Sequence, residues 1–184
     1  LEGSTLGIVG YGEIGRSTAK LARAFGMRVF AMRRRASLST DDPNLDAVYA
    51  PEQLEDMLAA ADYILIAAPN TPETRGMIGE SELNYMKSTA VIINVGRGPV
   101  IVETALVQAL ENKRIRGAAL DVFDHEPLPE GHPYYSFDNV LLSPHCADHT
   151  VGWVELAVDL FIENFKLFEA GQPLKNIVDK KAGY

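Results

Sequence analysis

The chain has 184 residues, 47% of them hydrophobic, which is enough for one ordinary domain with a core of its own. Its 17 basic and 25 acidic side chains give a formal net charge of −8, which argues against nonspecific binding to nucleic acid or to an anionic membrane surface. No apolar run reaches the length of about 20 residues that a membrane helix needs. The single cysteine, Cys146, excludes an internal disulfide and a cysteine-based zinc site.

Two kinds of apolar segment alternate along the chain. Short continuous runs predict strands buried on both faces, and the longer segments with helical spacing between them predict helices. The expected strands are residues 6–9, 28–32, 63–67, 90–95, 117–120 and 140–142, and the expected helices are residues 14–25, 51–61, 81–86, 102–112 and 151–170. Repeated strand–helix units predict an α/β protein with a doubly wound parallel sheet in three layers, as one domain over residues 1–184.

A glycine-rich segment lies directly between the first expected strand and the first expected helix, with the pattern G-x-G-x-x-G from Gly10 to Gly15. In a Rossmann unit, Gly10 would permit the tight turn, Gly12 would let a pyrophosphate approach the backbone, and Gly15 would let the helix pack against the strand. The helix N-terminus beyond it offers N–H groups and a positive dipole end to the anion. The segment therefore predicts a Rossmann dinucleotide-binding fold, with a purely structural glycine turn as the alternative.

The residue at the end of the second strand distinguishes NAD from NADP in such a fold. NAD sites usually have an acidic residue there, which binds the hydroxyls of the adenosine ribose. This chain has Arg33 at that place, followed by Arg34 and Arg35, and the next carboxylate is Asp41. A guanidinium pairs with a 2′-phosphate through two N–H donors, so we expect NADP(H) with Arg33 and Arg34 as contacts. NAD(H) stays possible if the arginines form a solvated loop.

Three polar segments follow later strands, and in an open α/β sheet the ligand binds outside the carboxyl ends of the strands. They place Arg97, Glu126 and His145 at that edge. An arginine can bind the carboxylate of a 2-keto acid and polarise its keto oxygen, while a histidine exchanges the proton that accompanies hydride transfer. A glutamate beside the histidine holds the imidazole and stabilises its charged form. Taken singly, each residue also has a structural alternative, such as a helix cap for Arg97.

Five segments in order carry a more specific signal. They are Gly-Tyr-Gly-Glu-Ile-Gly at 10–15, Pro-Asn-Thr-Pro-Glu-Thr at 69–74, Asn-Val-Gly-Arg-Gly at 94–98, Ala-Leu-Asp-Val-Phe-Asp-His-Glu-Pro at 119–127 and Ser-Pro-His at 143–145. With them the chain resembles the cofactor-binding domain of the D-isomer-specific 2-hydroxyacid dehydrogenases. That family includes phosphoglycerate dehydrogenase, glyoxylate and hydroxypyruvate reductases, D-lactate dehydrogenase and formate dehydrogenase.

The resemblance implies a role for each matching residue. Arg97 would orient the substrate, Glu126 would pair with the histidine, and His145 would be the acid–base group. Asp121 would hydrogen-bond the nicotinamide carboxamide. The residues implied to contact the cofactor are Gly10, Gly12, Glu13, Ile14, Gly15, Arg33, Arg34, Pro69, Thr74, Val95, Gly96, Arg97, Asp121 and His145. No metal ion is expected, since the chemistry needs none.

Two further features depart from the family pattern. His149 follows His145 by four residues, where many relatives have a small or neutral residue, and would face the cleft on a helical turn or point to solvent. The substrate domain, which precedes the first strand in relatives, is expected to be absent from this chain. The last helix and the tail after it would then expose apolar surface.

The resulting hypothesis is the cofactor-binding domain of an oxidoreductase that interconverts a 2-keto acid and its D-2-hydroxy acid, similar to glyoxylate/hydroxypyruvate reductases. A phosphoglycerate dehydrogenase-like NAD enzyme is one alternative. A dinucleotide-sensing regulator similar to the C-terminal-binding protein corepressors is another. The resemblance also implies a homodimer, with apolar residues of 102–110 and of the last helix as its surface, in the cytoplasm or an organelle matrix. The expected partner is a small-molecule acid, with no nucleic acid and no membrane.

Overall fold

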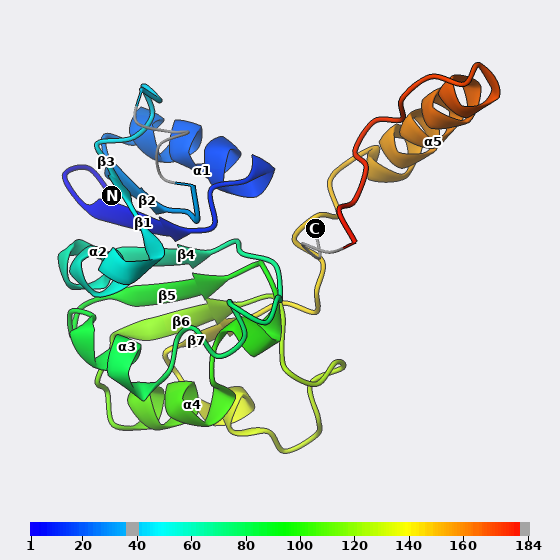
Figure 1. Cartoon of the computed structure of the whole chain (residues 1–184). Coiled ribbons are helices and arrows are strands. Elements are labelled where there is room, and N and C mark those ends of the chain that lie inside the picture. Colours follow the sequence, from blue (N-terminus) through cyan, green and yellow to red (C-terminus); the bar gives the residue numbers. More distant parts are fainter. Residues whose placement is uncertain (36–40, 181–184) are drawn as a thin grey trace.

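The computed structural model describes residues 1–35 and 41–180. Within these ranges, seven strands form one parallel sheet in the order β3-β2-β1-β4-β5-β6-β7 (Figure 1). They are β1 (Thr5–Val9), β2 (Arg28–Met32), β3 (Ala47–Tyr49), β4 (Tyr63–Ile66), β5 (Val91–Asn94), β6 (Gly117–Leu120) and β7 (Val140–Leu142). The predicted doubly wound α/β fold is confirmed, together with the six strands expected from the apolar runs.

The α-helices of the described residues lie close to where the helical spacing predicted them. They are α1 (Glu13–Ala24), α2 (Leu54–Ala60), α3 (Glu80–Tyr85), α4 (Glu103–Glu111) and α5 (Trp153–Glu169). Short 3₁₀ turns occur at Pro51–Gln53, Gly98–Val100 and Pro133–Ser136, each with a proline in its first turn. Proline fits there because the first N–H groups of a helix have no partner within the helix.

Strand β3 was not expected from the sequence. It has only three residues, all partly exposed, and it pairs at the edge of the sheet with β2 alone. The ring of Tyr49 contacts the ring of Phe30 on β2, with their centroids 5.7 Å apart. So short a run has no periodicity of its own, and its strand conformation depends on the neighbouring strand.

The strand register brings the loops of the site to one level. Val9 at the end of β1 is in register with Met32 of β2 on one side and with Ile66 of β4 on the other. The chain order reverses between β1 and β4, and ligands of open α/β sheets bind in the crevice at such a switch point. Gly10, Arg33 and the residues after Ile66 therefore leave the sheet side by side.

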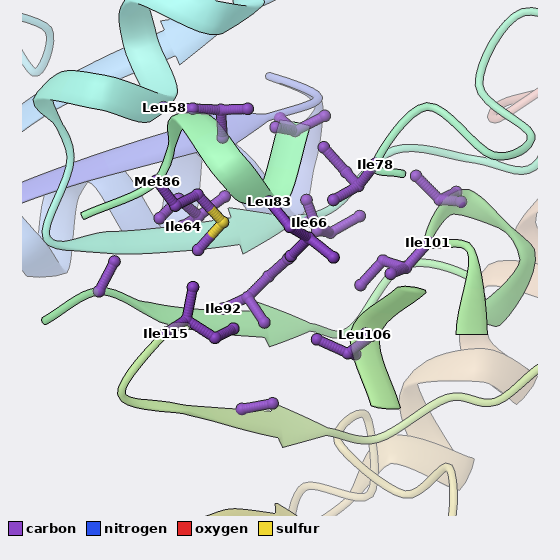
Figure 2. Close-up of a cluster of buried hydrophobic side chains, with 14 of the residues drawn as sticks. Leu58, Ile64, Ile66, Ile78, Leu83, Met86, Ile92, Ile101, Leu106 and Ile115 are labelled. Atoms are coloured by element: carbon purple, nitrogen blue, oxygen red, sulfur yellow. The ribbon is translucent and has the colours of Figure 1, made fainter. Parts of the chain in front are cut away.

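The larger core lies between the sheet and the layer formed by α2, α3 and α4. Figure 2 shows Leu83 of α3 beside Ile66 of the sheet. Leu58 of α2, Leu106 of α4 and Ile92 of β5 belong to the same cluster, and all five side chains are buried. Full burial of such a side chain stabilises the fold by about 1.5–3 kcal/mol. A smaller core lies on the other face, where alanines of α1 pack against β1 and β2.

Two expectations about packing hold only in part. The strands were expected to be buried on both faces, but β5 alternates between buried and partly buried residues, and Leu141 of β7 is 71% exposed. Apolar residues of 102–110 and of the last helix were expected to supply a dimer surface, but Ala105, Leu106, Ala109 and Leu110 are buried in the core of this chain, whereas Val102 is 39% exposed. From its sequence, a helix with apolar and polar residues can either pack on the core of its own chain or form an interface with a second chain. The packing in the structure distinguishes these two roles.

Helix α5 projects away from the sheet and its covering helices (Figure 1). It has no buried residue, although its sequence is rich in large apolar side chains. Phe161 and Phe168 are 69% and 72% exposed, and Ile177 after the helix is 70% exposed. The predicted exposure of apolar surface on the last helix and its tail is therefore confirmed. None of the helices in the described ranges has the length and apolar character needed to cross a bilayer.

Candidate active site

The phosphate loop has the geometry that its glycines predicted. Gly10 has φ of +96°, and a Cβ atom built there would lie 2.7 Å from the backbone N of Ala68. A Cβ at Gly15 would lie 2.6 Å from the carbonyl oxygen of Gly10, so the helix could not approach the strand. Around Gly12, in contrast, the space is open within 4 Å.

The first turn of α1 faces that open space. Gly12 is its N-cap, and no side chain of the described residues caps the N–H groups of this turn. Glu13 and Ile14 are exposed on it, as expected of residues beside a ligand. This helix end offers uncapped N–H groups and a positive dipole end, and the space beside Gly12 is open. These features fit the pyrophosphate of a dinucleotide.

The end of β2 carries the arginines. Arg33 is half-buried and donates its backbone N–H to the carbonyl of Tyr49 at 3.2 Å. Burial, followed by the charges of Arg16 and Arg35, lowers the pKa of the Arg33 guanidinium. Arg34 lies close enough to Glu73 to help lower the pKa of that carboxyl, after the hydrogen bonds that Glu73 accepts locally.

A carboxylate approaches the phosphate loop at a place that the sequence did not indicate. The hydroxyl of Tyr11 donates a hydrogen bond to Asp42 Oδ2 at 2.9 Å. Burial and then Asp42 raise the pKa of Tyr11 to about 12, so the phenol keeps its proton at neutral pH. Asp42 also accepts the backbone and side-chain N–H groups of Asn44 at 2.9 and 3.0 Å. The spacing of 31 residues gave no signal for this contact.

The loop after β4 is a hydrogen-bonded turn. Thr74 Oγ1 donates to the carbonyl of Pro69 at 2.5 Å and accepts the N–H of Thr71 at 2.8 Å. Val95, after the next strand, donates its N–H to the carbonyl of Ile66 at 3.1 Å. These bonds fix the turn beside the phosphate loop, where the sequence placed the adenosine.

The loop after β5 depends on a buried amide to which the sequence reasoning assigned no role. Asn94 is 1% exposed; its Oδ1 accepts the N–H of Gly96, and its Nδ2 donates to the carbonyl of Arg97, both at 3.1 Å. A Cβ at Gly96 would lie 2.6 Å from the carbonyl oxygen of Ala68. The loop is therefore held rigidly while the side chain of Arg97 stays exposed and donates to the Gly96 carbonyl at 2.7 Å.

Asp121 anchors the loop that carries the histidine. Its Oδ1 accepts Ser143 Oγ at 2.6 Å and the N–H of Cys146 at 2.9 Å, and its Oδ2 accepts the N–H of Ala147 at 3.1 Å. Burial alone would raise the pKa of Asp121, but these donors and the nearby His145 lower it. The predicted contact of Asp121 with a nicotinamide carboxamide stays a prediction.

Glu126 and His145 form a close pair. Glu126 Oε2 lies 2.6 Å from His145 Nδ1, and its Oε1 accepts the N–H of Phe123 at 3.0 Å. Burial would raise the pKa of Glu126, but the Phe123 N–H, His145 and Arg97 lower it, so the carboxylate is charged. His145 has φ of +53°, which costs a non-glycine residue about 1 kcal/mol, and the bonds from Asp121 to the next two N–H groups offset this strain.

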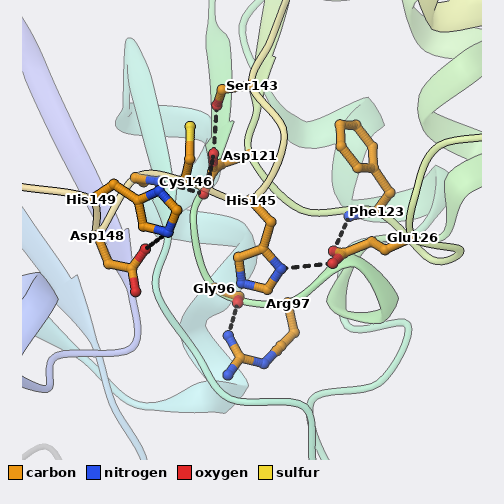
Figure 3. Close-up of polar contacts among 11 residues, drawn as sticks. Gly96, Arg97, Asp121, Phe123, Glu126, Ser143, His145, Cys146, Asp148 and His149 are labelled. Carbon is orange, nitrogen blue, oxygen red and sulfur yellow. Dashed lines mark hydrogen bonds and ion pairs between the residues drawn. The ribbon is translucent and has the colours of Figure 1, made fainter. Parts of the chain in front are cut away.

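Because Glu126 contacts Nδ1 of His145, the second imidazole nitrogen is the one available for proton transfer. Figure 3 shows His145 between Glu126 and Arg97, with its second ring nitrogen on the side of Gly96 and Arg97. Both residues of the pair line a cavity of about 320 Å³, whose other walls are mostly apolar. Its lining is Phe123, Glu126, Pro127, Leu128, Tyr135, Leu142, Ser143, Pro144 and His145. The three predicted catalytic side chains thus come from three loops to one edge of the sheet.

His149 is on no helical turn with His145, because α5 begins only at Trp153. Its ring stacks on the Trp153 indole, with centroids 5.1 Å apart. Its Nε2 lies 3.7 Å from Asp148 Oδ1 (Figure 3). Its side chain is about half exposed. Within the described ranges, no three His, Cys, Asp or Glu side chains are grouped so as to hold a metal ion.

Comparison with known families gives a direct answer. Residues 1–147 match the family model described as the NAD binding domain of D-isomer specific 2-hydroxyacid dehydrogenases. The chain belongs to this family. As a member of the family's NAD-binding domain, it binds a nicotinamide dinucleotide, and the phosphate loop has the geometry for it.

Individual relatives have the same character. A glyoxylate reductase of Aeropyrum pernix is 42% identical over 181 residues, and one of Pyrococcus furiosus is 39% identical over 181 residues. Each alignment covers 98% of this chain and 53% of the relative. The chain therefore spans about half the length of the curated relatives it matches.

Solved structures agree with this fold. A D-isomer specific 2-hydroxyacid dehydrogenase of Xanthobacter autotrophicus Py2, in complex with NADPH and MES, is 35% identical with a TM-score of 0.87, over 98% of this chain and 56% of that one. An NADPH-dependent glyoxylate/hydroxypyruvate reductase of Sinorhizobium meliloti, in complex with NADP and sulfate, is 30% identical with the same TM-score, over 98% and 57%.

Proposed function

We propose that residues 1–184 are the cofactor-binding domain of an NADP(H)-dependent reductase that converts a 2-keto acid to the D-2-hydroxy acid and back. Glyoxylate and hydroxypyruvate are the substrates to test first, because the relatives above are named for them. The observation that carries the proposal is the 2.6 Å pair of Glu126 and His145 facing the loop of Arg97. An exposed arginine, a histidine and a charged glutamate at one edge of the sheet are the groups that binding and protonating a 2-keto acid require.

Each side chain has a distinct task in the proposed reaction. The Arg97 guanidinium binds the substrate carboxylate through its N–H fork and polarises the neighbouring keto oxygen. A nicotinamide dinucleotide bound along the phosphate loop supplies the hydride to the keto carbon. His145 delivers the proton to the keto oxygen from the nitrogen that faces Arg97, and takes it back in the reverse direction. Glu126 holds the ring by its other nitrogen and stabilises the imidazolium.

Arg33 and Arg34 support NADP(H) over NAD(H). Both follow β2, where an NAD site usually has a carboxylate that binds the ribose hydroxyls. Two of the similar solved structures contain NADPH or NADP, which is in line with this choice. Asp42, a carboxylate later in the loop that follows β2, accepts hydrogen bonds from Tyr11 and Asn44.

The exposed apolar residues of α5 support the proposal that a second, substrate-binding domain belongs to the working enzyme. The chain spans only about half of its relatives, and a helix with no buried residue needs a neighbour. We also propose that the protein is a homodimer. A monomer at tens of micromolar, measured by size-exclusion chromatography with light scattering, would contradict this proposal. The cytoplasm or an organelle matrix fits a chain with one partly buried cysteine.

Turnover by the two-domain protein tests the proposal. We expect NADPH-dependent reduction of glyoxylate or hydroxypyruvate, and a loss of kcat of about 10²- to 10⁴-fold in His145→Gln with unchanged NADPH binding. His149→Gln is the matched control four residues away, and its kcat should stay within about twofold of wild type. Tight NADPH binding without turnover of any 2-keto acid would instead favour a dinucleotide-sensing regulator.

A further inference from the structure

The first turn of α1 carries a cation that the motif reasoning left without a role. Arg16 lies one residue beyond the last glycine of the phosphate loop, and its Cζ is 5.8 Å from the centre of the Tyr11 ring. Tyr11 is buried, and its hydroxyl is fixed by the 2.9 Å hydrogen bond to Asp42. The ring is therefore a rigid surface for the guanidinium, since cations are attracted to the face of an aromatic ring at this distance.

This place gathers like charges. Arg33 at the end of β2 is close enough to Arg16 and Arg35 for their charges, after burial, to lower its pKa. Among the described residues, Glu13 and Asp42 are carboxylates that interact with Arg16. Glu13 Oε1 lies 3.7 Å from Arg16 Nε, but its side chain is 94% exposed, so the pair is weak. The other carboxylate, Asp42, already accepts three hydrogen bonds from Tyr11 and Asn44.

Guanidinium groups that repel one another at the edge of a ligand site are stabilised by an anion between them. The position of that anion follows from the fold. The pyrophosphate belongs over the open space at Gly12, and the adenosine ribose belongs at the end of β2. Arg16 is on the helix turn after Gly12, and its charge acts on Arg33 and Asp42, both of which follow β2. Arg16 is therefore on the ribose side of the phosphate loop.

We propose that Arg16 binds the 2′-phosphate of NADP(H) together with Arg33, and so helps to select this cofactor over NAD(H). This inference rests on the proposed function, because it assumes a dinucleotide along the phosphate loop. It adds a specificity-determining residue on α1 to the arginines after β2. The phenol ring of Tyr11 supports the guanidinium on the side away from the phosphate.

The test compares Arg16→Gln with Lys20→Gln in this chain. Both residues are exposed on α1 one turn apart, and both substitutions remove one positive charge from a helix surface. The ligands are NADPH, NADH, 2′,5′-ADP and 5′-AMP, measured by calorimetric titration. We expect Arg16→Gln to weaken NADPH and 2′,5′-ADP by about 10- to 100-fold, with NADH and 5′-AMP within about twofold. Lys20→Gln should leave all four affinities within about twofold.

The outcomes separate this inference from the proposed function. If Arg16→Gln weakens NADPH and NADH equally, Arg16 acts at the pyrophosphate and the inference is wrong while the proposed function stands. If Arg16→Gln changes no affinity, or if Lys20→Gln has the same effect, the inference is also wrong. If wild type binds none of the dinucleotides, the proposed function itself fails. Unchanged NADH binding by Arg16→Gln also shows that the variant is folded.

Discussion

Replacing Asp121 by asparagine isolates the residue that holds the catalytic loop in place. The carboxylate is 5% exposed and accepts three hydrogen bonds, from Ser143 Oγ, the Cys146 N–H and the Ala147 N–H. An asparagine oxygen at the Oδ1 position can keep the first two bonds. Its NH₂ group then faces the partly buried Ala147 N–H, so two donors meet and the amide buried at position 121 has no acceptor on that side.

The size of the effect follows from these bonds. A buried donor without an acceptor costs about 1–3 kcal/mol, and the two remaining bonds lose their charge-assisted part. We therefore expect Asp121→Asn to lower the free energy of unfolding by about 2–4 kcal/mol at neutral pH. Asp124→Asn is the control on the following loop, where an exposed carboxylate should contribute less than about 0.5 kcal/mol.

The pH dependence gives a second signature. The pKa of Asp121 is lower in the folded chain than its ordinary value of about 3.9. Its contribution to stability is therefore complete above about pH 4 and is lost as the pH falls through the lower folded value. Urea unfolding followed by circular dichroism should show a difference between wild type and Asp121→Asn that is constant near neutrality and narrows in acid. A difference below about 0.5 kcal/mol, or one that grows in acid, would refute the reasoning.

Three other predictions concern the phosphate loop, the core and the cofactor. Gly10→Ala should lower the free energy of unfolding, measured with urea, by about 2 kcal/mol or more, because of the positive φ and the 2.7 Å approach to Ala68. Gly12→Ala should unfold like wild type in the same assay and should bind NADPH about tenfold more weakly in a titration. Leu106→Ala should lower the free energy of unfolding by about 2–5 kcal/mol in the same assay, since its side chain is 1% exposed in the larger core, and a loss under about 1 kcal/mol would contradict that packing. Arg33→Asp should shift the ratio of NADPH to NADH affinity toward NADH, and an unchanged ratio would mean that another residue selects the cofactor.

The sequence predicted what depends on local chemistry. Gly10 and Gly15 stand at backbone approaches that only glycine permits, and the space at Gly12 is open, so the glycine spacing indicated the geometry of this loop correctly. The continuous apolar runs indicated six strands, because burial in a parallel sheet demands such runs. The family motifs brought Arg97, Glu126 and His145 to one edge of the sheet, where the structure also has them.

Contacts between distant segments were beyond that reasoning. The hydrogen bond of Tyr11 with Asp42 joins two loops 31 residues apart, and no spacing rule predicts it. The bonds from Asp121 to Cys146 and Ala147 likewise depend on how β6 and β7 place their loops. Strand β3 exists only because its neighbour pairs with it. In each case a segment that is distant in the sequence but adjacent in the fold, and not the local sequence, determines the contact or the strand.

The central claim is that this chain is an NADP(H)-selective dinucleotide-binding domain. Fluorescence titration of the wild-type chain with NADPH and, separately, with NADH tests it most directly. The account predicts binding of both cofactors, with NADPH bound tighter by about tenfold or more, because guanidinium groups and no carboxylate follow β2 directly. Equal or tighter binding of NADH would contradict the claim, and it would leave the arginines after β2 as a solvated loop.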